Sequence, residues 1–191
     1  MYPSWMSEAS FYDFLERIDM DLAEATRQKG CGCAGVLHRA SYPRKPRGGP
    51  RDLGSGYDRR LSFCCARRDC RQRQTPPSVR FLGRKVYLGA VVVLVSAMRH
   101  GTTPARVARL EELVGASRRT LARWRGWWLE VFATSRFWRA AAGRFGRPVS
   151  VAELPLSLLE RFGGDERERL VAGLRFLASI TTGSARGAMA Y

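Results

Sequence analysis

The segment spanning residues 31–75 most constrains how this chain can fold. It is rich in Gly, Pro and Arg, contains all five cysteines of the 191-residue sequence, and has too few aliphatic residues to build a hydrophobic core. A segment of this composition folds only if something other than apolar burial holds it together. The clustered cysteines are the residues able to do this.

The cysteines form two close groups, Cys31-Gly-Cys33 and Cys64-Cys65-x4-Cys70. The N-terminus carries acidic residues and has no apolar stretch typical of a secretory signal, so we expect a cytoplasmic protein with reduced thiols. Two thiol pairs brought together across a loop supply the four tetrahedral ligands that zinc prefers. The sequence therefore predicts a structural zinc ion, whose binding free energy of roughly 10 kcal/mol or more would contribute directly to folding.

The residues before the last cysteine indicate which thiols face the metal. Leu61, Phe63 and Cys65 alternate as in a β-strand, which places Cys65 on the Phe63 face and Cys64 on the opposite face. Two alternatives stay open, because Cys64 can replace Cys65 and His38 can replace one cysteine. A set of free thiols without metal is the competing interpretation. The predicted metal ligands are Cys31, Cys33, Cys65 and Cys70.

The charge of the chain points to a polyanionic partner. Lys and Arg number 33 against 17 Asp and Glu, a formal net charge of +16. Double-stranded DNA is the expected partner and RNA the alternative; an excess of Arg that serves only solubility is the third interpretation. Residues 42–51 read as an extended basic arm that contacts phosphates or enters a minor groove, or else as a plain linker. The residues expected to touch nucleic acid here are Arg44, Lys45, Arg47, Arg67, Arg68, Arg71 and Arg73, with Arg80 beside them.

Helices are predicted on both sides of the cysteine segment. Apolar residues at three- and four-residue spacing predict an amphipathic helix over residues 7–29, ended by Gly30. The longest apolar run, residues 86–98, is too short to span a bilayer, so we expect a buried helix and no membrane partner. Further predicted helices cover residues 82–99, 103–113, 117–132 and 135–145, a short one after Ser150 with Glu153 completing a capping box, and residues 165–180.

Two of these helices match a DNA-reading unit. Thr103 is a good N-cap followed by Pro104, residues 114–116 form a short turn, and Ser117 caps the next helix. The first turns of a recognition helix contact base edges or phosphates. A three-helix bundle with a charged outer face is the competing interpretation. In either case the tryptophans recur at helical spacing among aliphatic residues, so we expect core residues rather than base-stacking platforms at Trp124, Trp127, Trp128 and Trp138. The candidate contact residues are Ser117, Arg118, Arg119, Thr120 and Arg123.

These elements together predict a mainly α fold with a small β zinc ribbon. An N-terminal helix precedes the ribbon, and a helical bundle containing the helix-turn-helix follows it. The predicted divisions are residues 1–29, 30–80, 81–147 and 148–191.

Two stretches of the chain resemble the N-terminal region of bacterial insertion-sequence transposases of the DDE type. They are RLSFCCARRDCRQRQTPPSVRF, similar to the second knuckle of a zinc ribbon, and KVYLGAVVVLVSAMRHGTTPARVARLEELVGASRRTLARWRGWW, similar to the helix-turn-helix. The resemblance implies zinc and DNA binding. The RNase H-like catalytic domain of that family has no counterpart here, and helix capping accounts for Asp165, Glu166 and Glu168. We therefore expect no enzyme activity but a truncated or accessory DNA-binding relative, nucleoid-associated in the cell. An RNA-binding or ribosome-associated zinc protein is the first alternative and an active transposase the second.

Overall fold

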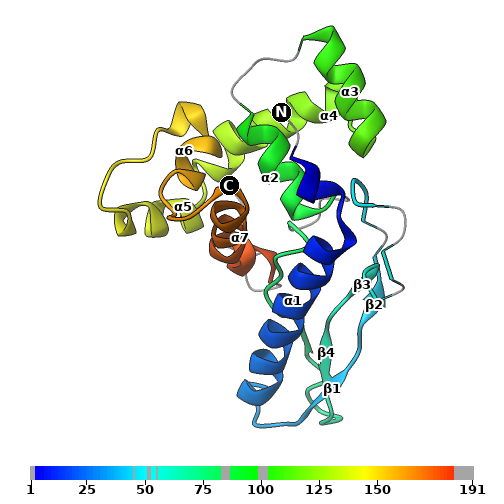
Figure 1. Cartoon of the computed structure of the whole chain (residues 1–191). Coiled ribbons are helices and arrows are strands. Elements are labelled where there is room, and N and C mark those ends of the chain that lie inside the picture. The colour runs from blue at the N-terminus through cyan, green and yellow to red at the C-terminus, as the bar shows by residue number, and fades with distance from the viewer. Residues whose placement is uncertain are drawn as a thin grey trace.

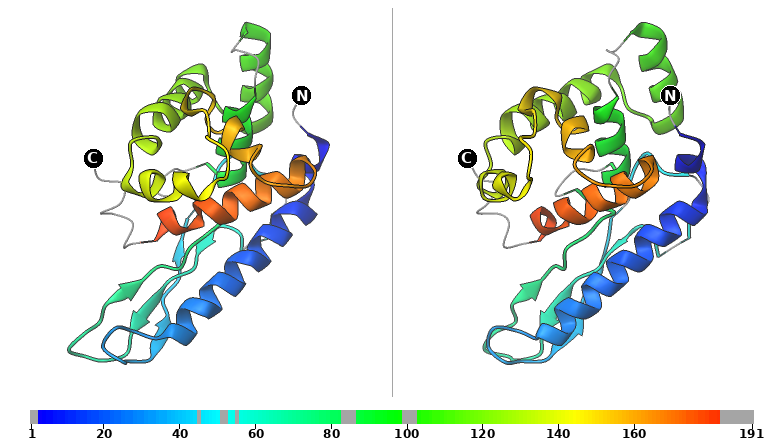
Figure 2. Two further views of the ribbon diagram at one scale, coloured as in Figure 1. Left: turned by 90° about the vertical axis from the view of Figure 1, so that its left-hand side faces the viewer. Right: turned by 60° about the vertical axis from the view of Figure 1, so that its left-hand side comes forward.

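The computed structural model describes residues 3–44, 46–50, 53–54, 56–82, 87–98 and 103–182. As predicted, the protein is mainly helical, with an N-terminal helix, small antiparallel sheets and a helical C-terminal region (Figure 1). The C-terminal half of the long first helix and the two sheets form an arm that projects from the helical region in every view (Figure 2). The cysteine cluster lies in this arm.

Helix α1 (Ala9–Lys29) follows a short 3-10 turn, η1 (Ser4–Ser7). Its apolar stripe is buried as the spacing predicted, with Phe11, Leu15 and Ile18 at most 4% exposed. The helix ends at Gly30, whose φ of 70° is a conformation that residues with a Cβ rarely adopt. That reversal turns the chain toward the first cysteine pair.

Within the described residues, five short strands form two antiparallel sheets beside α1. The three-stranded sheet has the order β1-β4-β5, and its register places Leu37 opposite Cys65. In the second sheet β2 pairs with β3, so the beginning of the predicted basic arm is strand-paired rather than unattached. Lys45 and Arg51 of that arm lie outside the described residues. The strands are β1 (Leu37–Arg39), β2 (Tyr42–Pro43), β3 (Arg59–Arg60), β4 (Phe63–Cys65) and β5 (Arg73–Gln74).

Helix α2 (Gly89–Ala97) is shorter than the predicted helix over residues 82–99. Tyr87 and Leu88 form isolated β-bridges instead, Leu88 with Phe81, so the prediction of the helix start was wrong. The apolar run is buried on all sides, and such a run carries no periodicity that locates a helix start. Among the described residues, no helix is long and apolar enough to cross a membrane.

The C-terminal region consists of short helices, several with the predicted caps. The side chains of Thr103, Ser117 and Ser135 each accept a backbone N–H bond at a helix start. Helix α4 continues into the π-helical turn η2. The elements are α3 (Pro104–Val114), α4 (Arg118–Gly126), η2 (Trp127–Phe132), α5 (Arg136–Ala141), η3 (Ala142–Arg144), η4 (Val151–Glu153), α6 (Leu156–Leu159), α7 (Glu166–Leu177) and η5 (Ala178–Thr181).

The capping box was predicted at the wrong place. Ser150 makes no side-chain cap, because η4 is a single three-residue turn, and its carbonyl instead accepts a 2.6 Å bond from Ser157 Oγ. The box occurs at α7, where Asp165 and Glu168 each accept a 2.8 Å bond from the other's backbone N–H. Capping thus accounts for these acids, as expected from the sequence.

Apolar side chains gather in two separate clusters. The main core joins the N-terminal part of α1 to the helical region, and Trp124, Trp128 and Trp138 are buried in it, as predicted for core residues. Helix α7 contributes Leu170 and Leu174 to this core and lies beside the N-terminal half of α1 (Figure 2), where the Arg167 guanidinium is 5.3 Å from the Phe11 ring centre. The second cluster lies in the arm and comprises Ala23, Cys31, Leu37, Phe63 and Cys65.

Candidate metal centre

The structure brings together the four thiols that the sequence singled out. All four sulfur atoms lie within 4.8 Å of one another. The Cys31 and Cys70 sulfurs are 3.7 Å apart, and those of Cys33 and Cys65 are 3.5 Å apart. Cys31 and Cys65 are buried and the other two are half-buried. The first pair lies in the loop after α1, and the second spans from β4 to the turn that follows it.

This arrangement fits a zinc ion. With four Zn–S bonds of about 2.3 Å, a tetrahedron has sulfur–sulfur edges of about 3.8 Å. The two distances above are close to that edge, and an all-sulfur donor set is typical of structural zinc sites. The buried four-cysteine group can therefore hold a metal ion such as zinc.

The two alternative ligands lie apart from the group. The Cys64 thiol donates to the Arg71 carbonyl at 3.4 Å, on the opposite face of β4 from Cys65. His38 is exposed on β1 and pairs in register with Cys64. The strand alternation that separated Cys64 from Cys65 is confirmed.

Both thiol pairs end in the same unusual backbone conformation. Ala34 (φ 62°) and Arg71 (φ 44°) directly follow Cys33 and Cys70, and within the described residues they alone adopt positive φ without being glycine. This conformation costs roughly 1–2 kcal/mol for a residue with a Cβ. Each turn is closed by a backbone bond, from Ala34 N–H to the Cys31 carbonyl at 2.8 Å and from Arg71 N–H to the Arg67 carbonyl at 3.0 Å. These two turns orient the thiols of both pairs toward a common point.

Gly35 is a further residue that the site requires and that the sequence analysis missed. A Cβ at this position would lie 2.6 Å from the Cys65 sulfur and 3.0 Å from the Arg67 side chain. Any other residue would therefore displace a thiol. The signal available in the sequence was the glycine two positions after Cys33.

The thiols differ in how readily they ionise. The backbone N–H of Cys33, with help from neighbouring thiols, lowers the pKa of Cys31 to about 7. Desolvation, and then hydrogen bonding among the same thiols, raises the pKa of Cys65 to about 12. Near neutral pH the group thus carries one thiolate easily and resists a second on Cys65. A bound cation removes that resistance, because it neutralises the charges that the burial penalises.

The arginines predicted to contact nucleic acid around the metal centre fall into two groups. Arg67 is held by Asp69 and by the Cys33 carbonyl, each at 3.0 Å, and Arg73 donates to the Ala40 carbonyl at 3.0 Å. Arg44 is half-buried, with its guanidinium 5.4 Å from the Phe81 ring centre. The second group comprises Arg47, Arg68 and Arg71, which are exposed and whose side chains form no hydrogen bond or ion pair with the described residues.

Arg80 does not belong to this surface, contrary to the expectation from sequence. Its side chain is fully buried and forms an ion pair with Asp19 of α1, Nε to Oδ2, at 2.8 Å. Asp19 also accepts bonds from Ser78 Oγ at 2.5 Å and from Val79 N–H at 2.7 Å. The carboxylate lies beside Ile18 on the buried face of α1, and an acid at such a position was the missed signal.

On α4 the structure separates the predicted contact residues by exposure. Arg118, Arg119 and Arg123 are exposed. The Ser117 side chain caps α4 by accepting a hydrogen bond from the Thr120 backbone N–H. Thr120 is only 8% exposed, and its hydroxyl lies 3.2 Å from that of Ser117. The three arginines are therefore the side chains placed to reach a partner. A role in nucleic-acid contact stays a prediction for all five.

The chain was also compared with known proteins. No protein-family model, curated protein or solved structure matches it.

Proposed function

We propose that the protein binds double-stranded DNA through a helix-turn-helix formed by α3 and α4, and that a structural zinc ion holds its arm. The observation that carries the proposal is the three-residue connection between these helices. Gly115 ends α3 with φ 67°, Ala116 is fully buried, and Ser117 caps α4. A short turn of this kind, containing glycine, is typical of helix-turn-helix units.

The turn is anchored from below by aromatic side chains. The Tyr87 hydroxyl donates to the Gly115 carbonyl at 2.5 Å, and its ring packs edge-on against Trp124, 5.0 Å between centres. Leu121 and Trp124 bury the inner face of α4. Arg119 and Arg123 lie one turn apart on the opposite, exposed face. This arrangement suits a helix that enters a major groove with its N-terminal half. Arg side chains there can bind guanine or phosphate.

The arm supplies a second cationic surface close to the metal centre. Arg68 and Arg71 lie in and beside the turn that carries Cys70. With a net charge of +16, binding is expected to weaken steeply as salt rises. This order of parts resembles the N-terminal region of insertion-sequence transposases. A truncated or accessory relative would bind DNA without cutting it.

Two steps test the proposal. First, sequences that bind the protein are selected from a random pool of DNA duplexes. Second, the selected duplex competes for the protein with structured RNA of equal length at two salt concentrations. The double variant Arg119→Gln/Arg123→Gln should weaken binding of the selected duplex at least about tenfold. The matched control is Arg136→Gln/Arg139→Gln on α5, which removes the same charge from exposed positions. It should cost less than about threefold. Equal losses in both variants would contradict the helix-turn-helix, and preference for the RNA would instead favour a basic RNA-binding zinc protein.

A further inference from the structure

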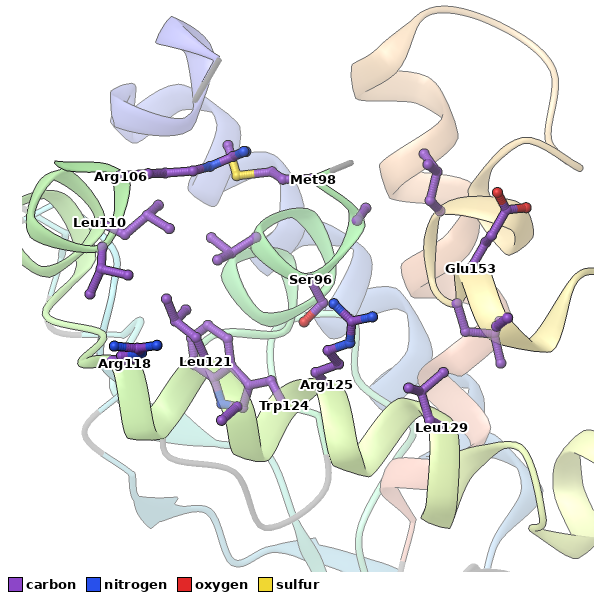
Figure 3. A pocket seen from close by; sticks show the side chains of 17 residues that line it. Ser96, Met98, Arg106, Leu110, Arg118, Leu121, Trp124, Arg125, Leu129 and Glu153 are labelled. Carbon is purple, nitrogen blue, oxygen red and sulfur yellow. The ribbon is translucent and has the colours of Figure 1, made fainter. Parts of the chain in front are cut away.

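A pocket of about 450 Å³ opens between α2, α3, α4 and the η4–α6 segment, on the side of α4 away from Arg119 and Arg123. Figure 3 shows Leu121, Trp124 and Leu129 along one wall, with Ser96 of α2 facing them. Pockets of this size suit small organic molecules, which bind in mostly apolar cavities with a few polar groups. Its walls do not take part in the metal centre.

The pocket contains a buried polar group without a partner. Among the described residues, the hydroxyl oxygen of Ser96 is buried and makes no hydrogen bond. A buried hydroxyl left unpaired is costly, and a bound ligand atom would relieve that cost. In Figure 3 the Ser96 hydroxyl points into the same space as the Arg125 guanidinium.

The charge of the lining is unbalanced. Three arginines, Arg106, Arg118 and Arg125, line the pocket against one acid, Glu153. Neither Arg118 nor Arg125 forms an ion pair or side-chain hydrogen bond within the part of the chain that the structure describes, and both are exposed at the rim. Guanidinium groups beside an apolar wall select ligands that combine a negative head with an apolar body.

We propose that this pocket binds a small organic anion with an apolar body, such as an aromatic or aliphatic carboxylate or sulfonate. The anionic head lies between Arg125 and the Ser96 hydroxyl, which are neighbours in Figure 3, and the apolar body packs against Leu121 and Leu129. This inference is independent of DNA binding. It requires only the folded helical region.

The test uses anilinonaphthalene sulfonate, an apolar aromatic anion that fluoresces when it leaves water, and the uncharged N-phenylnaphthylamine as its neutral counterpart. The sulfonate should bind once per chain with Kd on the order of tens of micromolar. The neutral dye should bind at least about tenfold more weakly, since it lacks the charged group. Equal affinity for the two dyes would overturn the assignment of an anion site.

Two pairs of variants locate the site. Ala152→Trp places a large ring at an exposed lining position and should abolish dye binding, whereas Val151→Trp, exposed next to it but outside the lining, should leave Kd unchanged. Arg125→Gln should weaken the sulfonate about tenfold, and Arg123→Gln should not. If the two variants of either pair bind the dye with the same Kd, the proposed site is wrong. Since Arg123→Gln weakens DNA binding under the proposed function and Arg125→Gln weakens dye binding here, failure of one proposal is distinguishable from failure of the other.

Discussion

The helical region and the arm of this protein are held together in different ways. In the helical region, large aromatic and aliphatic side chains such as Phe132, Leu158 and Leu170 are completely buried. In the arm the buried cluster consists of Ala23, Leu37, Phe63 and two thiols. Apolar burial stabilises the first region, whereas the second has few apolar side chains and is expected to depend on a metal ion held by its thiols. We therefore expect the helical region to stay folded when the thiols are removed and the arm to unfold.

The comparison is tested most strongly by removing one thiol. Cys65→Ser should lose about one zinc per chain and abolish hydrogen-exchange protection in β1 and β4, because a structural zinc site contributes roughly 10 kcal/mol. Protection in α2 and α7 should remain. Metal content and residue-resolved exchange measure both effects. The matched control is Cys64→Ser, which retains a donor to the Arg71 carbonyl and should keep zinc. Loss of zinc in both variants, or in neither, would remove the distinction between the regions.

A second test addresses the buried ion pair that links α1 to residues 78–80. Asp19→Ala leaves the buried Arg80 guanidinium with only its longer ion pair to Glu16, at 3.4 Å, and should lower the free energy of unfolding by up to about 3–5 kcal/mol. Urea unfolding followed by tryptophan fluorescence measures the change. Asp21→Ala, an exposed acid on the same helix, should stay within about 0.5 kcal/mol of the parent. If the double variant Asp19→Leu/Arg80→Met is no more stable than Asp19→Ala, the loss does not come from the unpaired charge.

The third and smallest effect is the pH dependence of metal binding. Without metal, the pKa of Cys65 is about 12, so zinc must displace its proton throughout the neutral range, and affinity should fall at least about tenfold per pH unit on acidification. The pKa of Cys31 is lowered to about 7, so this thiol adds a further proton only below that pH. The stabilisation from its thiolate is present at alkaline pH and lost as pH falls through 7. Zinc affinity can be measured by competition with a chromophoric chelator between pH 6 and 8.5. A plot of the logarithm of the affinity against pH should steepen below about pH 7, and a constant slope would contradict the lowered pKa of Cys31.

Local features were predictable from the sequence, and features set by distant contacts were not. The four thiols could be chosen because strand alternation and close spacing are local, and the caps at Thr103 and Ser117 follow from their neighbours. The burial of Arg80 depends on α1, some sixty positions earlier, which charge patterning along the chain does not reveal. Likewise the pocket exists only once α2, α4 and η4 are packed together.

Helix α1 belongs to both regions, since Phe11 and Leu15 lie in the main core and Ala23 lies in the cysteine cluster. Its 21 residues make a rod about 32 Å long. Because the helix is stiff, it holds the metal centre at a nearly constant distance from the end of the molecule where α1 begins. That separation is close to one turn of B-form DNA, about 34 Å. Under the proposed function, the arginines beside the thiol cluster would therefore contact a duplex at a fixed distance from the start of α1.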